Sequence, residues 1–179
     1  MGLIQQLKND WIHHGRDFTK PGFKALAFHR FGNWRMGIKS KILRIPFSIL
    51  YKFLFIRARN KYGIELPYTV KLGYGVIFEH QHGIVIHGNT VIGDNCIVRQ
   101  GVTIGNRYTD RPLDAPILRN NVNIGAGAVI LGNITIGNNV HIGANAVVLN
   151  SIPDNHMAYG VPAIIRPLVN AEQRNKINE

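Results

Sequence analysis

Residues 118–148 read LRNNVNIGAGAVILGNITIGNNVHIGANAVV, and an apolar residue returns at every sixth position. This first column contains Leu118, Ile124, Ile130, Ile136, Ile142 and Val148. A second column of small or β-branched residues lies four positions further on, at Val122, Ala128, Ile134, Val140, Ala146 and Ile152. A period of six fits neither the 3.6-residue helix nor a long alternating strand. It is typical of short strands joined by tight turns in a hexapeptide β-helix.

The same period continues towards the N-terminus through Leu72, Phe78, Ile86, Ile92, Val98 and Ile104. Twelve such units on three-sided turns predict a parallel β-helix of about four coils, and so a mainly β protein. Asn and Gly cluster between the units, where sharp corners need residues that tolerate a positive φ. A β-sandwich with regular turns is the alternative, but sandwiches do not keep a fixed six-residue phase.

The period is broken twice. Eight residues instead of six separate Phe78 from Ile86, and fourteen separate Ile104 from Leu118. Residues 106–117 therefore cannot all lie in the coil. An insertion that leaves a rigid solenoid predicts a functional loop, and a solvated excursion is the alternative.

Residues 1–63 are predicted to be mostly helical. Leu3, Leu7 and Trp11 have helical spacing, Pro21 is placed to open a second helix, and 39–62 would form a third. Gly32 and Gly37 are expected to interrupt the pattern. The predicted organisation is thus a basic helical segment 1–63, a β-helix domain 64–168 with the protruding loop 106–117, and a short polar C-terminal tail 169–179.

The net charge of +11 lies entirely in residues 1–63, which hold thirteen Lys or Arg against two Asp. Within them, residues 39–61 interleave basic with aromatic and aliphatic side chains, a composition typical of an interfacial helix. We therefore expect peripheral contact with an anionic membrane. A helix that packs on the protein with a solvated basic face is the alternative. Nucleic acid is not expected as a partner, because no recognised motif accompanies the charge.

Composition excludes several classes of protein. Hydrophobic residues make up 45% and charged ones 17%, which excludes intrinsic disorder, and the single cysteine excludes a disulfide scaffold or a Cys-rich zinc site. Residues 1–10 lack the apolar core of a secretion signal, and the apolar run 45–56 is interrupted and too short to span a bilayer. We expect a cytoplasmic protein, with peripheral association at the inner face of the cytoplasmic membrane.

Several stretches between residues 65 and 167 resemble the left-handed β-helix acyltransferases of the serine acetyltransferase branch. They are 79–85 (EHQHGIV), 101–105 (GVTIG), 122–132 (VNIGAGAVILG), 142–148 (IGANAVV), 152–155 (IPDN) and 160–163 (GVPA). Within this branch the chain is most similar to the colanic-acid and capsule type of polysaccharide O-acetyltransferases. Residues 1–63 are shorter than the helical domain of the serine enzymes, and Asp114 and Ala115 stand where those enzymes carry an Arg-His pair.

The resemblance implies the left hand of the helix, acetyl-CoA as acetyl donor, no metal, and a homotrimer with active sites between neighbouring subunits. It assigns the general base to His80, with His82 as the fallback. Histidine suits this role because its ordinary pKa lies near neutrality. Glu65 aligns with the family's acidic partner of the base, one coil earlier, and Glu79 with an acid near the acceptor.

The other implied site residues divide between the two substrates. The pantetheine arm of the coenzyme would lie along Gly125, Ala126, Gly143 and Ala144, although corners favour small residues in any case. Asn106 aligns near the thioester. Arg166 is assigned a phosphate contact, although the family's basic residue aligns nearer Ile164. Arg107 and Asp114 of the loop are placed with His82 and Glu79 on the acceptor side.

These assignments predict an acetyl-CoA-dependent O-acetyltransferase acting on a sugar hydroxyl of a surface-polysaccharide precursor, with a glycan or glycolipid as acceptor. Two alternatives stay open. One is a serine O-acetyltransferase of cysteine biosynthesis, and the other is a non-catalytic hexapeptide-repeat scaffold.

Overall fold

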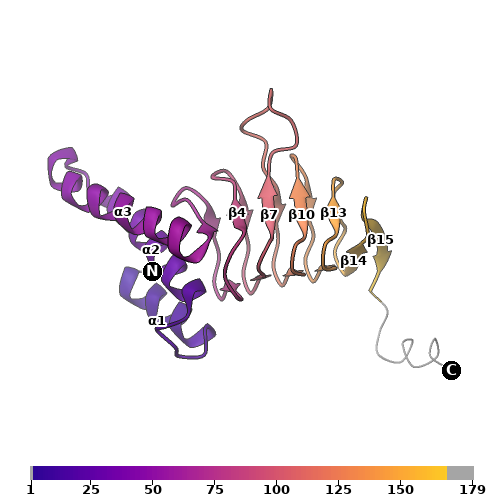
Figure 1. The fold of residues 1–179 in the computed structure, drawn as a ribbon, viewed down its shortest axis with the longest axis horizontal. Coiled ribbons are helices and arrows are strands. Elements are labelled where there is room, and N and C mark those ends of the chain that lie inside the picture. Colours follow the sequence, from indigo (N-terminus) through magenta and orange to yellow (C-terminus); the bar gives the residue numbers. More distant parts are fainter. Residues whose placement is uncertain (1, 169–179) are drawn as a thin grey trace.

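The computed structural model describes residues 2–168 and consists of a three-sided parallel β-helix with α-helices packed on its N-terminal end (Figure 1). The prediction of a mainly β protein with an N-terminal helical segment is confirmed. The predicted polar tail of residues 169–179 lies outside the described residues.

Each turn of the chain adds one short strand to each of three sheets. The first sheet contains β1 (Ile64–Glu65), β4 (Ile84–Ile86), β7 (Thr103–Gly105), β10 (Val129–Leu131) and β13 (Val147–Val148). The second contains β2 (Lys71–Leu72), β5 (Val91–Ile92), β8 (Ile117–Leu118) and β11 (Thr135–Ile136). The third contains β3 (Ile77–Phe78), β6 (Ile97–Val98), β9 (Asn123–Ile124), β12 (His141–Ile142), β14 (His156–Tyr159) and the antiparallel β15 (Ile164–Pro167).

The strand register explains both breaks in the six-residue period. In the regular coils, stacked positions are 18 residues apart, as for Asn121 and Asn139. The first break lengthens this spacing to 20, and the inserted loop lengthens it to 26. The strands stay paired in both cases, so the extra residues leave the prism at its corners. The first sheet has five strands, because β1 begins the stack before the apolar columns become regular.

The interior of the prism is filled by the predicted columns. In the first sheet Ile86, Ile104, Ile130 and Val148 lie in register on neighbouring strands, and each is at most 1% exposed. The small residues of the second column, among them Val122, Ala128, Val140 and Ala146, are fully buried. Burial of these stacked apolar side chains is the dominant force that holds the coils together.

One corner of the prism, between the second and third sheets, is built from asparagines. Asn95, Asn121, Asn139 and Asn155 all have φ between 54° and 58°. Their side chains also form a ladder: Asn121 donates to Asn139, and Asn139 to Asn155, each at 2.9 Å. Asparagine tolerates this left-handed conformation, and its amide can both donate and accept, so the same residue satisfies the turn and the stack.

The N-terminal helices are α1 (Leu3–His13), α2 (Pro21–Trp34) and α3 (Lys41–Tyr62), with the short 3₁₀ helix η1 (Arg35–Gly37) between the last two. Pro21 opens α2, as expected. The third helix begins at Lys41 rather than residue 39, because the Ser40 hydroxyl accepts from the Leu43 N–H at 3.4 Å and caps it. None of the described helices combines the length and the hydrophobicity needed to cross a membrane.

The prediction that Gly32 interrupts the helix is wrong, because α2 runs through it to Trp34. The Cβ atom that any other residue would bring here would collide with the Tyr51 ring of α3. Gly32 therefore serves the close packing of α2 against α3, whereas Gly37 does end the helical stretch that includes η1.

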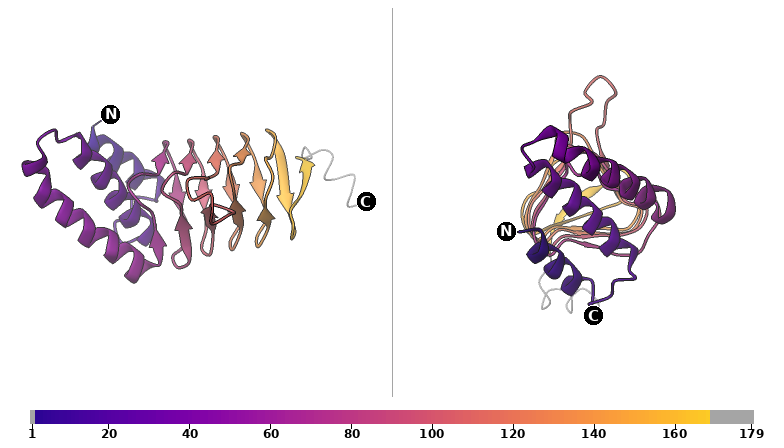
Figure 2. Two further views of the ribbon diagram at one scale, coloured as in Figure 1. Left: turned by 90° about the horizontal axis from the view of Figure 1, so that it is seen from above. Right: turned by 90° about the vertical axis from the view of Figure 1, so that its left-hand side faces the viewer.

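A buried ion pair fastens the helices to the first coil. The Arg30 Nε of α2 lies 3.0 Å from the Asp10 Oδ2 of α1, and both side chains are buried. The same guanidinium donates to the carbonyl oxygens of Leu72 at 3.0 Å and Gly73 at 2.7 Å. One side chain thus connects two helices to the strand β2, so the helices cap the open end of the prism, as both views in Figure 2 show.

Candidate active site

The corner of the prism between the third and first sheets carries most of the predicted site, and we call it the His80 edge. It consists of the segments 79–83, 99–102, 125–128 and 143–146, one from each successive coil. Backbone hydrogen bonds join them: the N–H of His82 donates to Tyr62, that of Gly101 to His82, that of Gly127 to Gln100, and that of Asn145 to Ala126. These bonds are 2.8–3.0 Å long, so the edge is a regular stack that fixes the side chains on it.

His80 lies in the turn after β3, where the first break adds two residues. Its φ is 66°, and that of His82 is 75°, a region that residues with a Cβ rarely adopt. Both side chains are exposed. Backbone strain of this kind is concentrated at functional sites, and here it accompanies the two histidines that the sequence selected as bases.

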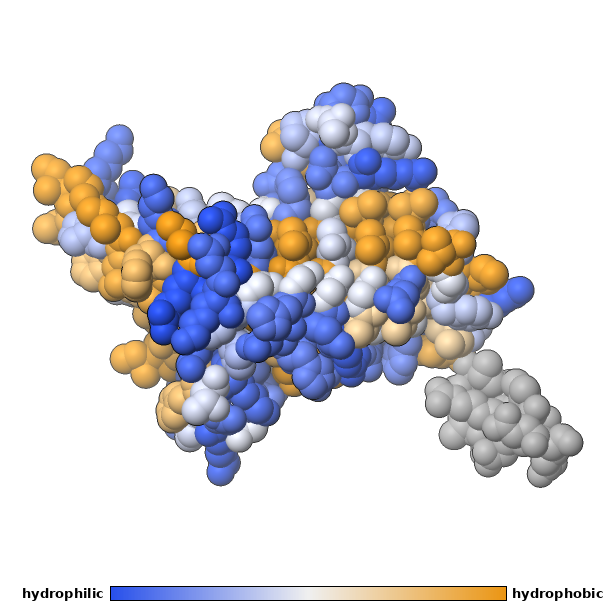
Figure 3. Space-filling view, viewed as in Figure 1, coloured by the Kyte–Doolittle hydropathy of each residue, from blue (hydrophilic) through white to orange (hydrophobic). Residues whose placement is uncertain are grey.

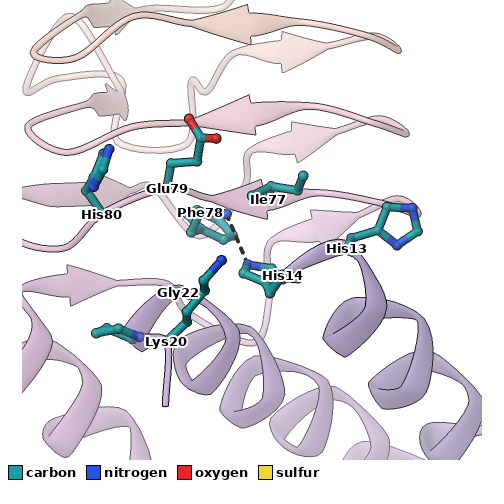
Figure 4. A pocket seen from close by; sticks show the side chains of 9 residues that line it. His13, His14, Lys20, Gly22, Ile77, Phe78, Glu79 and His80 are labelled. Carbon is teal, nitrogen blue, oxygen red and sulfur yellow. Dashed lines mark hydrogen bonds between the residues drawn. The ribbon is translucent and has the colours of Figure 1, made fainter. Parts of the chain in front are cut away.

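A cavity of about 340 Å³ opens beside His80, between the first coil and the helices α1 and α2 (Figure 4). It is lined by His13, His14, Lys20, Pro21, Gly22, Ile77, Phe78, Glu79 and His80. The structure therefore brings the predicted residues Glu79 and His80 together in one wall. It adds three side chains from the helical segment that no sequence motif had marked, namely those of His13, His14 and Lys20.

His14 joins the helices to the floor of this cavity. Its Nδ1 lies 2.7 Å from the Asp10 carbonyl oxygen, and its Nε2 lies 3.4 Å from the Phe78 backbone N–H, the bond drawn in Figure 4. A neutral ring with the proton on Nδ1 satisfies both contacts, because Nδ1 then donates and Nε2 accepts. Burial lowers the pKa of His14, which favours this neutral form.

Glu79 is already paired. Its Oε2 lies 2.9 Å from the Arg99 Nε on the next coil, and both side chains are about one-third exposed. The Arg99 Nη1 also donates to the Asn123 side chain and, at 3.1 Å, to the Ile124 carbonyl oxygen. The guanidinium thus neutralises the carboxylate beside His80 and connects three coils along the His80 edge.

The structure does not bring Glu65 into contact with His80. Glu65 lies on the outer face of the first sheet, in register with Val85, whereas His80 lies in the corner that precedes β4. Within residues 2–168, no hydrogen bond or ion pair joins the two side chains. His80 follows Glu65 by fifteen residues, whereas this coil takes 20, so Glu65 lies beneath Val85 rather than beneath the imidazole.

The residues predicted to contact the coenzyme lie on the His80 edge as well. Gly125 and Ala126 follow β9, and Gly143 and Ala144 follow β12, one coil further from His80. A Cβ atom on Gly125 would meet the backbone of Ala144, so the stacking of coils alone already requires glycine there. Arg166 is exposed in β15, at the far end of the stack.

Asn106, Arg107 and Asp114 lie on a different corner, between the first and second sheets, which we call the loop edge. Residues 106–116 project from it between β7 and β8 (Figures 1 and 2). The Asn106 side chain donates to the Tyr108 carbonyl oxygen at 2.9 Å, and the Arg107 guanidinium lies 5.2 Å from the centre of the Tyr108 ring. Because the two corners are separate, one chain alone does not bring this loop to His80.

Arg99 is a further site residue that the sequence motifs had not marked. It lies 20 residues after Glu79, the same separation as between the paired strands β3 and β6, so the register would have placed it directly above the carboxylate. No group of three His, Cys, Asp or Glu side chains that could hold a metal ion occurs among the residues that the structure describes.

Comparison with known proteins agrees with this arrangement. The bacterial transferase hexapeptide family (six repeats) matches residues 115–150. The putative colanic acid biosynthesis acetyltransferase WcaB of Escherichia coli K12 is 37% identical over 169 residues, which are 92% of this chain and 98% of WcaB. The chain belongs to the hexapeptide-repeat transferase family. A serine acetyltransferase of Synechococcus elongatus is 39% identical over 142 residues, 79% of this chain.

Solved members of the family have the same fold. Soybean serine acetyltransferase superposes with a TM-score of 0.78 at 30% identity, over 92% of this chain and 69% of the soybean chain. A serine acetyltransferase in complex with CoA gives 0.74 at 31% identity, over 92% and 69%. This likeness agrees with the predicted left-handed helix. The chain spans only 55% of the length of the Synechococcus enzyme.

Proposed function

We propose that the protein is an acetyl-CoA-dependent O-acetyltransferase that acetylates a sugar hydroxyl of a surface-polysaccharide precursor, with His80 as the general base. The observation that carries the proposal is the position of His80. This exposed imidazole borders a cavity and shares one rigid edge with the small residues of the coenzyme track. A base, a cavity and a row of small residues held on one edge are suited to transfer between two substrates.

The chemistry needs no group beyond the two substrates and the base. The His80 imidazole would take the proton of the acceptor hydroxyl while the oxygen attacks the carbonyl carbon of the thioester. The tetrahedral oxyanion then collapses, the bond from carbon to sulfur breaks, and the thiol leaves with the proton from the imidazolium. An oxyanion forms in this step, so backbone N–H donors near the thioester would lower the barrier. Asn106 stays our proposal for that position.

The charges at the site favour a sugar over serine as acceptor. Serine carries an ammonium and a carboxylate, and its recognition requires one free anion and one free cation in the site. In the loop, Asp114 and Ala115 stand where the serine enzymes carry an Arg-His pair, so the cation that would face the serine carboxylate is missing from that position, and the carboxylate of Glu79 is paired with Arg99. A neutral sugar hydroxyl needs neither charge. The near-complete coverage of WcaB supports the same choice.

Serine O-acetyltransferase remains the second candidate, because a serine acetyltransferase of Synechocystis is 41% identical to this chain over 145 residues. The two candidates are separated by incubating the purified protein with acetyl-CoA and either L-serine or candidate glycans and glycolipids, and by measuring the mass of the acceptor. Acetylation of a glycan is the expected result. Acetylation of L-serine and of no glycan would reject the proposal.

We also propose a cytoplasmic homotrimer with sites shared between subunits. Two features support the trimer. The His80 edge and the loop edge are different corners of one chain, so a neighbouring copy could supply the loop that faces His80. The outer face of the first sheet also carries the row Val85, Thr103, Val129 and Val147 in register, apolar at all but Thr103, and Figure 3 shows apolar side chains beneath the loop. Apolar outward positions of this kind are typical of surfaces that pack against a partner.

A further inference from the structure

The helix α3 has two opposite apolar faces. One contains Tyr51, Ala58 and Tyr62, which are buried against the rest of the protein. The other is a stripe in which apolar residues recur every three or four positions, the spacing that places side chains on one helix face: Ile42, Ile45, Ile49, Phe53 and Ile56. These five side chains are 36–79% exposed, and we call them the α3 stripe.

Basic side chains border the α3 stripe on both sides. With about 100° of turn per residue, Lys41, Lys52 and Arg59 lie along one border, and Arg57 and Lys61 lie along the other together with the exposed Leu43 and Leu50. All five basic side chains are exposed. Residues 41–62 contain no Asp or Glu at all, so no acidic side chain of the helix offsets this charge.

The position of α3 leaves the stripe open. The helix lies at the end of the molecule opposite the C-terminal strands, and it extends beyond the prism (Figure 1). In the space-filling view, apolar side chains gather at this end next to strongly hydrophilic ones (Figure 3). Single exposed apolar residues are ordinary, whereas a contiguous apolar strip bordered by charge marks a surface that binds something.

We propose that α3 binds flat on an anionic membrane surface, with the α3 stripe inserted among the lipid headgroups and the basic borders facing the phosphates. An apolar strip between two basic rows is the arrangement that lets a helix lie in the interface plane. A second copy of the chain fits less well. Two such helices packed along their stripes would bring basic rows together with no acid on either helix to pair them.

The test uses the full-length protein and flotation with two kinds of vesicle, phosphatidylcholine alone and phosphatidylcholine mixed with phosphatidylglycerol. The wild type is expected to float with the mixed vesicles and not with the neutral ones. The variant Ile49→Gln/Phe53→Gln should lose binding at least tenfold, since the apolar insertion is removed. The variant Lys52→Gln/Arg59→Gln should lose roughly fivefold for each charge. The matched control is Ile4→Gln. Ile4 is 83% exposed but lies on α1, outside the α3 stripe, so its substitution should leave binding unchanged.

Two results would overturn the proposal. One is a wild-type protein that does not float with anionic vesicles. The other is a stripe variant that binds them as the wild type does. In the first case, a stripe variant that dissociates into smaller assemblies by light scattering would show that the stripe is a contact between copies. The proposal does not depend on the acceptor, and acetyl transfer to a soluble acceptor should be the same in the stripe variant and the wild type.

Discussion

The carboxylate of Glu79 and the guanidinium of Arg99 form an ion pair with a distance of 2.9 Å between Oε2 and Nε, on the corner of the prism that also carries His80. The two residues belong to successive coils, so the pair exists only because the strands β3 and β6 are in register. An unpaired carboxylate in this position would oppose the negative charge that develops on the thioester oxygen. The pair therefore adjusts the charge of the site and contributes little to folding.

We predict that the ion pair between Glu79 and Arg99 affects activity more than folding stability. In a cycle of Glu79→Gln, Arg99→Gln and the double variant, the coupling in the free energy of unfolding should be at most about 1 kcal/mol, because the pair is partly exposed. The kcat/KM for the glycan should fall about tenfold in Arg99→Gln. It should recover in part in the double variant, which lacks the unpaired carboxylate.

Urea denaturation and acetyl-transfer assays measure the two quantities. The matched control is Arg119→Gln, an exposed arginine on the corner between the second and third sheets, which should change neither. A coupling of several kcal/mol, or full activity in Arg99→Gln, would show that the pair holds the coils together instead.

The buried histidines predict a dependence of stability on pH. Burial lowers the pKa of His29 to about 4, and its Nε2 lies 2.9 Å from the Val70 carbonyl oxygen. In the unfolded chain His29 takes up a proton near its ordinary pKa of 6.5. Above that pH neither state is protonated, so His29 causes no loss of folding stability there. Folding stability is lost as the pH falls towards about 4, by up to roughly 3 kcal/mol. His14 acts in the same direction.

Chemical denaturation at several pH values between about 4 and 6.5 gives the slope of the free energy of unfolding against pH. The variant His29→Gln retains a donor for the Val70 carbonyl oxygen but cannot take up a proton, so its stability should fall less steeply than that of the wild type. The control His141→Gln changes an exposed histidine and should keep the wild-type slope. Equal slopes for wild type and His29→Gln would mean that His29 is not held neutral.

Shared sites predict complementation between two inactive variants. The variants His80→Ala and Asn106→Ala/Arg107→Ala damage different corners of the prism, and each alone should lose most activity. If a site takes His80 from one copy and the loop from its neighbour, random mixed trimers of the co-expressed variants should regain about a quarter of the wild-type sites. A co-expressed mixture no more active than either variant would show that no site combines His80 of one copy with the loop of another.

The sequence was most informative where one repeated contact decides the structure. Columns such as Ile86, Ile104 and Ile130 identified the β-helix, because each coil buries the same positions. The histidine turn was located by the break in the period after Phe78. In both cases the pattern is local to one or two coils, so it can be recognised without coordinates.

Contacts that depend on the exact register or on packing between segments could not be predicted in this way. Arg99 meets Glu79 because the first break makes that coil 20 residues long, and His14 reaches Phe78 because α1 docks on the first coil. The family resemblance placed Glu65 about one coil before His80, and only the pairing with Val85 showed on which face of the sheet it lies. Side-chain direction at corners is set by φ, which the residue type alone does not determine.

The role of His80 is tested most directly by the rate of CoA release from acetyl-CoA in the presence of the unmodified glycan that serves as acceptor, for the wild type, His80→Ala and His82→Ala. We predict that His80→Ala lowers kcat by roughly 10²–10⁴, the usual contribution of a general base, with an unchanged circular dichroism spectrum and a smaller effect of His82→Ala. A His80→Ala protein that is folded and transfers acetyl groups at the wild-type rate would contradict it.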